Sequence, residues 1–222
     1  MKKITLLLFT FCLALTLSAQ TTIWEEDFDS YTPTTNVGEV IDVPAGFTNY
    51  DVDGDTYGWG LTQLSNWSTQ QQIDFANYYS NNWMISASFV TNNGVNGNLG
   101  IGALTPNNIL TLPQISIPVG AADVNFTFLV GSGSSPNDFE ETYDVIVTTS
   151  NTQGDILAAT PALTSTLTFE GSQTRTINLD AYIGQDIYIS FRHYDTTDEF
   201  ILGLDDLKVE AATLGINDFN LN

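Results

Sequence analysis

Apolar and polar residues alternate with a period of two along this 222-residue chain, and this pattern constrains the fold more than any other feature. In residues 124–130 the Val and Phe side chains fall on one face, and segments 143–148 and 187–194 repeat the pattern. Such alternation is typical of antiparallel strands with one face buried. Beyond the first 19 residues no segment keeps an apolar period of 3.6, and Ile73–Tyr79 is compatible with a single helical turn at most.

Further strand candidates are separated by Gly, Asn, Asp and Pro residues. They are Ile23–Asp29, Tyr57–Leu64, Trp83–Val90, Ile109–Ile117, Leu163–Phe169, Arg175–Leu179 and Phe200–Val209. The last candidate changes parity near Gly203, which predicts a β-bulge there. About ten strands predict an all-β fold, an antiparallel two-sheet β-sandwich of jelly-roll type.

The N-terminus is typical of an export signal, with a basic start, an apolar run and small residues near position 19. We therefore expect a signal peptide at 1–19, one domain at 20–210 and a linker, or a truncated lead-in to a sorting domain, at 211–222. The only cysteine, Cys12, lies inside the signal. The mature chain is expected to be extracellular, without disulfides and without membrane insertion.

The chain is strongly acidic, with a formal net charge of −21. Removing Lys2 and Lys3 with the signal would leave three basic side chains against 26 acidic ones, a charge near −23. Such a chain cannot neutralise phosphates, so nucleic acid is excluded as a partner. The charge is compatible with solubility in a salty medium and with cation binding.

Three acidic clusters predict calcium binding, because carboxylates held close together need a cation or protons. The clusters are Glu25–Asp27 with Asp29, Asp51–Asp55, and Asp205 with Asp206. The first and last strands of a jelly roll often lie side by side, which would join the first and third clusters. The candidate Ca²⁺ ligands are Glu26, Asp27, Asp51, Asp53, Asp55, Asp205 and Asp206.

Two of the clusters also have a purely structural interpretation. The 51–55 stretch is not an EF-hand loop, because Gly54 is its fourth residue and Thr62 stands at position twelve. It is either a calcium loop of another kind or an exposed Asp-Gly turn. Asp205 and Asp206 are either ligands or charges that protect an edge strand from aggregation.

The sequence gives little support for catalysis. His193 is the only histidine, and it falls on the apolar face of its segment, as a core-rim residue would. No nucleophile-elbow motif is present. Ser30 stands where the Glu-x-Asp-x-x-Glu motif of sandwich glycosidases has its second glutamate. We therefore expect no enzyme activity; the alternative is an accessory or weakly active part of a secreted glycosidase or peptidase.

Aromatic residues beside amide side chains suggest a ligand surface. Trp67, Tyr78 and Tyr79 lie near Ser, Asn, Thr and Gln residues, and exposed rings there would suit sugar stacking or a protein interface. The alternative is that these rings fold onto the sandwich. The expected partner is an extracellular glycan or protein, bound by a monomeric module; a structural spacer without a ligand is a third possibility.

Seven short segments occur in the order found in one protein family. They are Glu26–Phe28, Pro44–Phe47, Asp51–Asp55 with Trp59, Asn82–Ser86, Tyr182–Gln185, Phe191–His193 and Leu204–Leu207. Together they resemble the cleaved-adhesin and choice-of-anchor J domains of secreted Bacteroidetes proteins, relatives of the MAM-like jelly rolls. Phe47 and Ala87 depart from the family's usual Trp and Pro.

The resemblance implies a calcium-stabilised jelly roll that serves adhesion or stands beside a secreted enzyme. Residues 214–219 resemble the lead-in to a type IX secretion sorting domain. This tail implies transit across the outer membrane and attachment at the cell surface.

Overall fold

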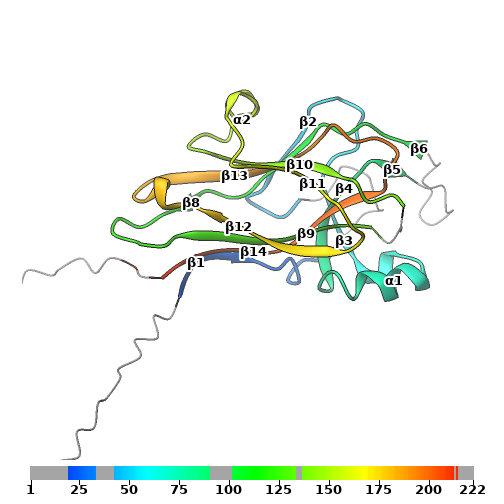
Figure 1. Cartoon of the computed structure of the whole chain (residues 1–222), viewed down its shortest axis with the longest axis horizontal. Coiled ribbons are helices and arrows are strands. Elements are labelled where there is room, and N and C mark those ends of the chain that lie inside the picture. The colour runs from blue at the N-terminus through cyan, green and yellow to red at the C-terminus, as the bar shows by residue number, and fades with distance from the viewer. Residues whose placement is uncertain (1–19, 34–42, 91–101, 134–136, 213, 215–222) are drawn as a thin grey trace, which may run out of the picture.

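The computed structural model describes residues 20–33, 43–90, 102–133, 137–212 and 214. In these residues the chain forms a sandwich of two antiparallel sheets, which confirms the expected all-β class (Figure 1). The expected signal at 1–19 and most of the expected tail lie outside the described residues. The last strand continues through Ala211, so the folded domain extends one residue beyond the expected boundary.

Sheet A contains the first and last strands of the domain. Its order is β12-β9-β14-β4-β3, with β1 also pairing with β14. The strands are β1 (Thr21–Glu26), β3 (Gly60–Gln63), β4 (Asn82–Ala87), β9 (Asn125–Ser132), β12 (Ser172–Asn178) and β14 (Ile201–Ala211).

Sheet B packs against sheet A in the order β11-β10-β13-β7-β2, with β8 also pairing with β13. Its strands are β2 (Thr48–Asp51), β7 (Asn108–Thr111), β8 (Ile115–Ser116), β10 (Thr142–Thr148), β11 (Leu163–Thr166) and β13 (Asp186–His193). A separate pair joins β5 (Phe89–Val90) to β6 (Gly102–Ala103). The described residues hold more strands than expected because 83–90 and 109–117 each divide into two, and because β2 and β6 were not among the candidates.

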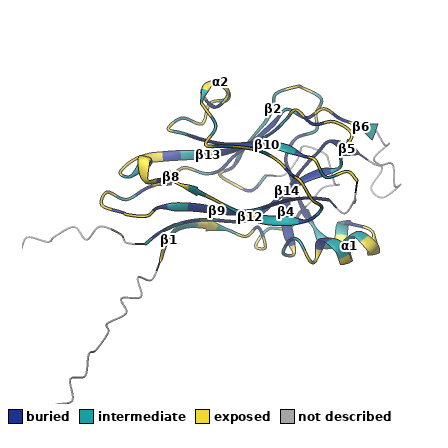
Figure 2. Ribbon diagram, viewed as in Figure 1, coloured by how far each residue is buried: buried dark blue, intermediate teal, exposed yellow. Residues whose placement is uncertain are grey.

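The main core is formed by side chains of both sheets. Figure 2 marks long stretches of their strands as buried. Phe126 and Phe128 of β9 point inward to Phe191 of β13, with ring centroids 5.0–6.0 Å apart. These are residues of the alternating segments, so the period-two pattern correctly predicted which face is buried. A second apolar cluster lies on the other side of sheet A, under the first helix.

Helix α1 (Thr69–Phe75) begins four residues earlier than the helical turn expected at 73–79. Its N-cap is Ser68, whose hydroxyl accepts a hydrogen bond from the Gln71 N–H, while the Gln71 side chain accepts one from the Ser68 N–H. This reciprocal capping box fixes the start of the helix. Phe75 is its only fully buried residue, which explains the weak helical period.

Helix α2 (Gln153–Ala158) was not expected from the sequence. Thr152 caps it by accepting a hydrogen bond from the Asp155 N–H. The Thr-x-x-Asp pattern is a helix-start signal that periodicity analysis does not use. Two 3₁₀ turns, η1 (Leu64–Asn66) and η2 (Asp180–Tyr182), complete the helical elements, and no described helix is long and apolar enough to cross a bilayer.

The β-bulge expected near Gly203 is displaced along β14. Gly203 pairs regularly with Ile85 of β4 and Gly131 of β9, whereas the register shifts between Asp205 and Lys208. The prediction of a bulge was right and its position was wrong. The glycine has another cause, because Tyr79 packs directly on its Cα.

Candidate functional site

The first and last strands lie side by side, as expected from the sequence. Glu26 of β1 is the register partner of Leu207 of β14, and Glu25 is the partner of Lys208. The first and third acidic clusters therefore meet at one place on sheet A. The acidic cluster at 51–55 lies elsewhere, in the connection from β2 to β3.

The bulge in β14 coincides with a change of neighbouring strand. Up to Leu204 the strand pairs with β4, and from Leu207 onward it pairs with β1. Asp206 adopts the left-handed conformation, with φ of +48°. The bulge turns the two acids to opposite sides, so that Asp205 is fully buried and Asp206 is exposed.

Asp205 is held by three donors. Its Oδ2 accepts hydrogen bonds from the Ser80 N–H at 2.7 Å and the Ser80 hydroxyl at 2.8 Å, and its Oδ1 accepts one from the Asp206 N–H at 2.8 Å. Burial nevertheless raises the pKa of Asp205 to about 7. Burial also raises the pKa of Asp206, and the charges of Asp27 and Asp29 add to that effect. A cation bound among these acids would relieve both penalties.

The acids of β1 are also positioned by hydrogen bonds. Glu26 accepts from the Phe28 N–H at 2.8 Å and from the Tyr31 hydroxyl at 2.9 Å. The Asp27 carboxylate accepts from the Asp29 N–H at 3.1 Å.

Asp29 was not among the expected ligands, although the sequence places it in the same cluster. Its Oδ1 accepts from the Asn82 N–H at 2.9 Å and from the Ser80 hydroxyl at 3.4 Å. Ser80 therefore lies between Asp29 and Asp205, and this contact between distant segments gave no sequence signal.

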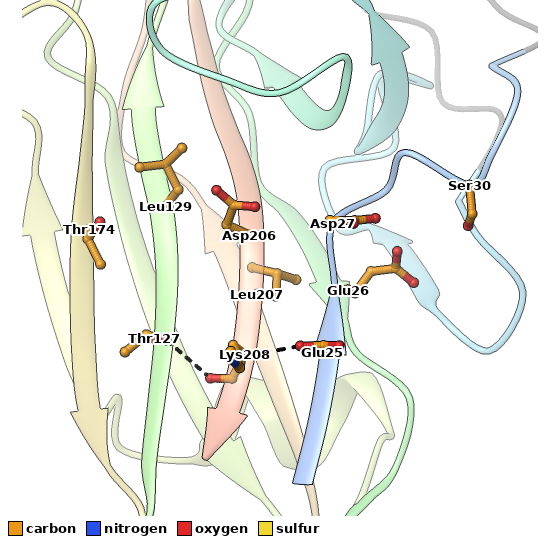
Figure 3. A pocket seen from close by; sticks show the side chains of 10 residues that line it. All are labelled: Glu25, Glu26, Asp27, Ser30, Thr127, Leu129, Thr174, Asp206, Leu207 and Lys208. Carbon is orange, nitrogen blue, oxygen red and sulfur yellow. Dashed lines mark hydrogen bonds and ion pairs between the residues drawn. The ribbon is translucent and has the colours of Figure 1, made fainter. Parts of the chain in front are cut away.

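A groove crosses the outer face of sheet A at this point (Figure 3). Its volume is about 660 Å³. The lining residues are Glu25, Glu26, Asp27, Ser30, Thr127, Leu129, Thr174, Asp206, Leu207 and Lys208. Figure 3 shows the acids of β1 and β14 on one side, with Thr127, Leu129 and Thr174 of β9 and β12 on the other.

Lys208 is the single basic residue of the groove. Its ammonium lies 2.7 Å from Glu210 and 3.9 Å from Glu25. The Glu25 side chain is 67 % exposed, so the longer pair contributes little stability. The groove as a whole is therefore acidic, with a floor of threonine and leucine side chains.

The second acidic cluster forms a compact loop. Asp51, Asp53 and Asp55 each offer a carboxylate oxygen, and these oxygens lie within 4.8 Å of one another. Calcium binds oxygens at about 2.3–2.6 Å, so a cation at their centre would have suitable distances. The donor set therefore fits Ca²⁺, with ligands taken from Asp51, Asp53 and Asp55.

Backbone donors shape this loop. Asp51 accepts hydrogen bonds from the Gly54 and Thr56 N–H groups at 2.7 and 2.9 Å, and Asp53 accepts one from Asn107 at 2.5 Å. Burial, together with a hydrogen bond to Asp51, raises the pKa of Asp53 to about 6. Carboxylates that share a proton in this way are also arranged to share a cation.

The exposure expected for the aromatic residues is not found at two of the three positions. Trp67 is 7 % exposed and Tyr79 is 6 % exposed. Trp67 stacks on Trp83 at 6.2 Å and meets Phe75 edge-on at 4.6 Å, because α1 folds the segment onto sheet A. Only Tyr78 is half-buried, and its hydroxyl reaches Glu170 at 3.3 Å. The first two rings are therefore closed to a ligand in this structure.

His193 is fully buried and has two polar partners. Its Nε2 lies 2.8 Å from Glu141 and its Nδ1 lies 2.9 Å from the Ser86 hydroxyl. The alternation of residues 187–194 correctly predicted that His193 faces the interior, but it gave no signal for the two partners, which come from distant segments of the chain. A serine, a histidine and an acid in contact resemble a hydrolase triad, yet all three side chains are closed to solvent.

Comparison with known proteins places the chain in a family. Residues 31–209 match the model of the Cleaved Adhesin Domain. Hemagglutinin A of Porphyromonas gingivalis is 28 % identical over 208 residues, which cover 86 % of this chain. Lys-gingipain of the same species is 30 % identical over 184 residues, or 76 % of this chain. The chain spans only 7 % and 9 % of these relatives' lengths.

Solved domains of Lys-gingipain from P. gingivalis W83 share the fold. The K3 cleaved adhesin domain superposes with a TM-score of 0.63 at 26 % identity, covering 86 % of this chain and 99 % of that domain. The K1 domain gives a TM-score of 0.62 at 26 % identity, with coverages of 89 % and 99 %. The likeness thus extends over the whole of each solved domain.

Proposed function

Because the chain belongs to the cleaved adhesin domain family, we propose that it is a non-catalytic binding module of an extracellular surface protein. Its ligand would lie in the acidic groove over sheet A, and calcium would stabilise the acidic clusters. The observation that carries this proposal is the groove formed where β1 meets β14, within a domain of adhesin type. The signal-like N-terminus and the sorting-like tail support export to the cell surface.

The charge of the groove favours one class of ligand. Four acidic side chains line it, against one lysine that is already paired with Glu210. A protein segment that carries Lys or Arg would complement this lining, and an acidic glycan would be repelled. We therefore place an extracellular protein first and a neutral glycan second.

Binding through the groove predicts a specific effect of Glu25→Lys. The variant is expected to weaken binding of a Lys/Arg-rich probe peptide by on the order of tenfold, about 1.4 kcal/mol. Asp186→Lys is the matched control, because it makes the same charge change at the start of β13 in sheet B. Fluorescence anisotropy in constant calcium and salt would measure both.

Four outcomes separate the possibilities. A loss confined to Glu25→Lys supports the groove, whereas equal losses in both variants would mean a general charge effect. If the wild type does not bind the peptide but binds neutral glycans on an array, the ligand is a neutral glycan and not a protein. Blank results with peptides, glycans and extracellular matrix proteins would contradict the binding function and favour a structural spacer.

Calcium is expected to raise the melting temperature of the protein. A ligand that binds only the folded state at about 100 times its Kd adds about 2.7 kcal/mol. In a domain of this size that corresponds to roughly 5–10 °C. Differential scanning calorimetry with EDTA, and then with added CaCl₂, measures the shift.

Two variants divide the calcium effect between the clusters. Asp53→Asn removes one charge from the 51–55 loop, and Asp206→Asn removes one from the bulge in β14. Each is expected to remove part of the calcium-dependent shift, whereas Asp186→Asn should leave it intact. An unchanged melting temperature in a wild-type protein that elemental analysis shows to be metal-free would rule out the calcium proposal.

A further inference from the structure

A polar network lies between the two sheets, and one of its members, Asn108, is the register partner of Asp51 at the start of the acidic loop. Its members are fully or almost fully buried: Ser86 and Ser88 at the end of β4, Asn108 in β7, Glu141 before β10 and His193 in β13. It joins sheet A to sheet B through side chains, in a region where the rest of the core is apolar. Neither the family match nor the proposed function assigns it a role.

The Glu141 carboxylate has three polar partners, two of which can only donate to it. Oε1 accepts from the Ser88 hydroxyl at 2.8 Å and from the Phe200 N–H at 3.0 Å. Oε2 lies 2.8 Å from His193 Nε2. An ionised carboxylate can only accept, so Nε2 of the imidazole carries a proton.

The contacts at the opposite end of the network are compatible with a hydrogen bond donated to the other ring nitrogen. The Asn108 amide N–H₂ donates to the Ser86 oxygen at 3.2 Å. The hydroxyl hydrogen of Ser86 is then free to donate to His193 Nδ1, which is 2.9 Å away. The hydrogen bonds therefore run in one direction, from Asn108 through Ser86 and His193 to Glu141, and the ring is the neutral Nε2–H tautomer.

A second proton on the ring would reverse the direction of the hydrogen bonds on the Ser86 side of His193. With Nδ1 protonated, the ring donates to the Ser86 oxygen, and the hydroxyl hydrogen must turn away toward Asn108. It finds an acceptor only if the Asn108 amide rotates and presents Oδ1. In the described residues Oδ1 is buried without a hydrogen-bond partner, so the amide has no second contact that holds its orientation.

We propose that this network is a proton-dependent switch between the sheets, called the lock below. Protonation of His193 Nδ1 reverses the direction of the hydrogen bond between Ser86 and His193 and makes the Asn108 amide rotate. The proton comes from solvent, and no covalent bond other than N–H changes. The two states differ in the bond between β4 and β7: Asn108 donates to Ser86 in one state and accepts from it in the other.

The titratable groups around the network are acidic or phenolic among the described residues. Tyr143 of β10 is the register neighbour of His193, and Tyr79 has its pKa raised by burial, with smaller effects from Asp205, Tyr78 and Glu141. Glu199 accepts a hydrogen bond from the N–H of Glu140, next to Glu141. Its pKa is raised by burial and by the charges of Glu141, Glu140 and Asp138. Arg192 points away, toward Asn107 and the ring of Tyr194. Glu141 is therefore the nearest group that could take up the proton in place of the ring.

Nitrogen-15 NMR of the imidazole tests the proposal directly, because His193 is the only histidine of the chain. The protein would be purified without a histidine tag. At neutral pH we expect the Nε2–H tautomer alone. As the pH falls, Nδ1 should gain its proton with the same midpoint as a change in the Asn108 side-chain amide signals. An Nδ1–H tautomer at neutral pH, or amide signals that do not follow the ring, would overturn the lock.

Glu141→Gln gives a sharper test. The glutamine oxygen can keep the hydrogen bonds from the Ser88 hydroxyl and the Phe200 N–H. The glutamine N–H₂ then faces His193 Nε2 and donates to it. The ring must then carry its proton on Nδ1, and the Asn108 signals should take their low-pH positions at neutral pH. A variant that folds and keeps the Nε2–H tautomer contradicts the proposal.

Ser86→Ala covers the case in which Glu141→Gln does not fold. It should leave the tautomer unchanged and abolish the response of Asn108 to pH. Ser190→Ala is the control, because it removes a buried hydroxyl that pairs with Thr111 at 2.8 Å outside the network. If Ser190→Ala abolished the response equally, the coupling would be a general effect of losing a buried hydroxyl.

Discussion

Replacing Trp83 with alanine is expected to lower the free energy of unfolding by about 3–5 kcal/mol. Trp83 is fully buried, stacks on Tyr79 at 5.1 Å and on Trp67 at 6.2 Å, and packs against Phe75 at 5.5 Å. The substitution would open a cavity at the centre of the cluster that attaches α1 to sheet A. Urea unfolding followed by circular dichroism would measure the loss.

Two phenylalanine variants distinguish lost packing from lost hydrogen bonding. The Trp83 indole N–H is buried without a partner in the described residues, so Trp83→Phe removes ring area and no hydrogen bond. Trp67→Phe breaks the 3.1 Å bond from its indole N–H to the Thr62 hydroxyl and leaves that oxygen buried. We expect Trp67→Phe to cost more than Trp83→Phe. The opposite order would mean that lost ring packing costs more than the lost hydrogen bond. A loss below about 1 kcal/mol for Trp83→Ala would mean that the cluster contributes little stability.

The pattern of the strands was predictable because alternate residues of a half-buried strand face the core and the solvent. Phe126, Phe128 and Phe191 all point into the core as the alternation indicates. The pairing of β1 with β14 was predictable from jelly-roll topology, and with it the meeting of Glu26 and Asp206 at one groove. These features depend on local periodicity and on the order of strands, which one sequence contains.

The remaining features depend on contacts between distant segments. Trp67 and Tyr79 have polar neighbours in sequence, yet α1 covers them, so local composition wrongly predicted exposure. Ser80 binds both Asp29 and Asp205, and Glu141 binds His193, across separations that no short pattern encodes. The helix starts were different, because capping residues marked them locally and a search limited to periodicity passed over them.

The sequence has two features near Gly203, the glycine itself and an irregular alternation, and they have different causes that the sequence could not separate. The bulge accounts only for the irregular alternation. The bulge forms at Asp205 and Asp206 because β14 changes neighbours there. The glycine is required because an aromatic ring occupies the space where a side chain would stand.

Gly203→Ala is accordingly expected to destabilise the fold by about 2–3 kcal/mol, which corresponds to roughly 4–12 °C in melting temperature. A Cβ at this position would lie 2.6 Å from Cζ of Tyr79 and closer still to its hydroxyl oxygen. That ring is fixed by its stack on Trp83 and by a 3.2 Å hydrogen bond to the Ser132 carbonyl, so it cannot move aside freely. Calorimetry in EDTA would measure the effect without any contribution from bound calcium.

A double-mutant cycle identifies the clash as the cause. Tyr79→Leu removes the ring, so Gly203→Ala should cost less in that background, with a coupling energy of about 0.5–3 kcal/mol. Gly154→Ala is the matched control: it lies exposed in α2 with no atom within 4 Å of the added carbon, and it should stabilise the protein by about 0.4–1 kcal/mol. Additive losses in the cycle would show that the cost of Gly203→Ala does not come from the approach of Tyr79.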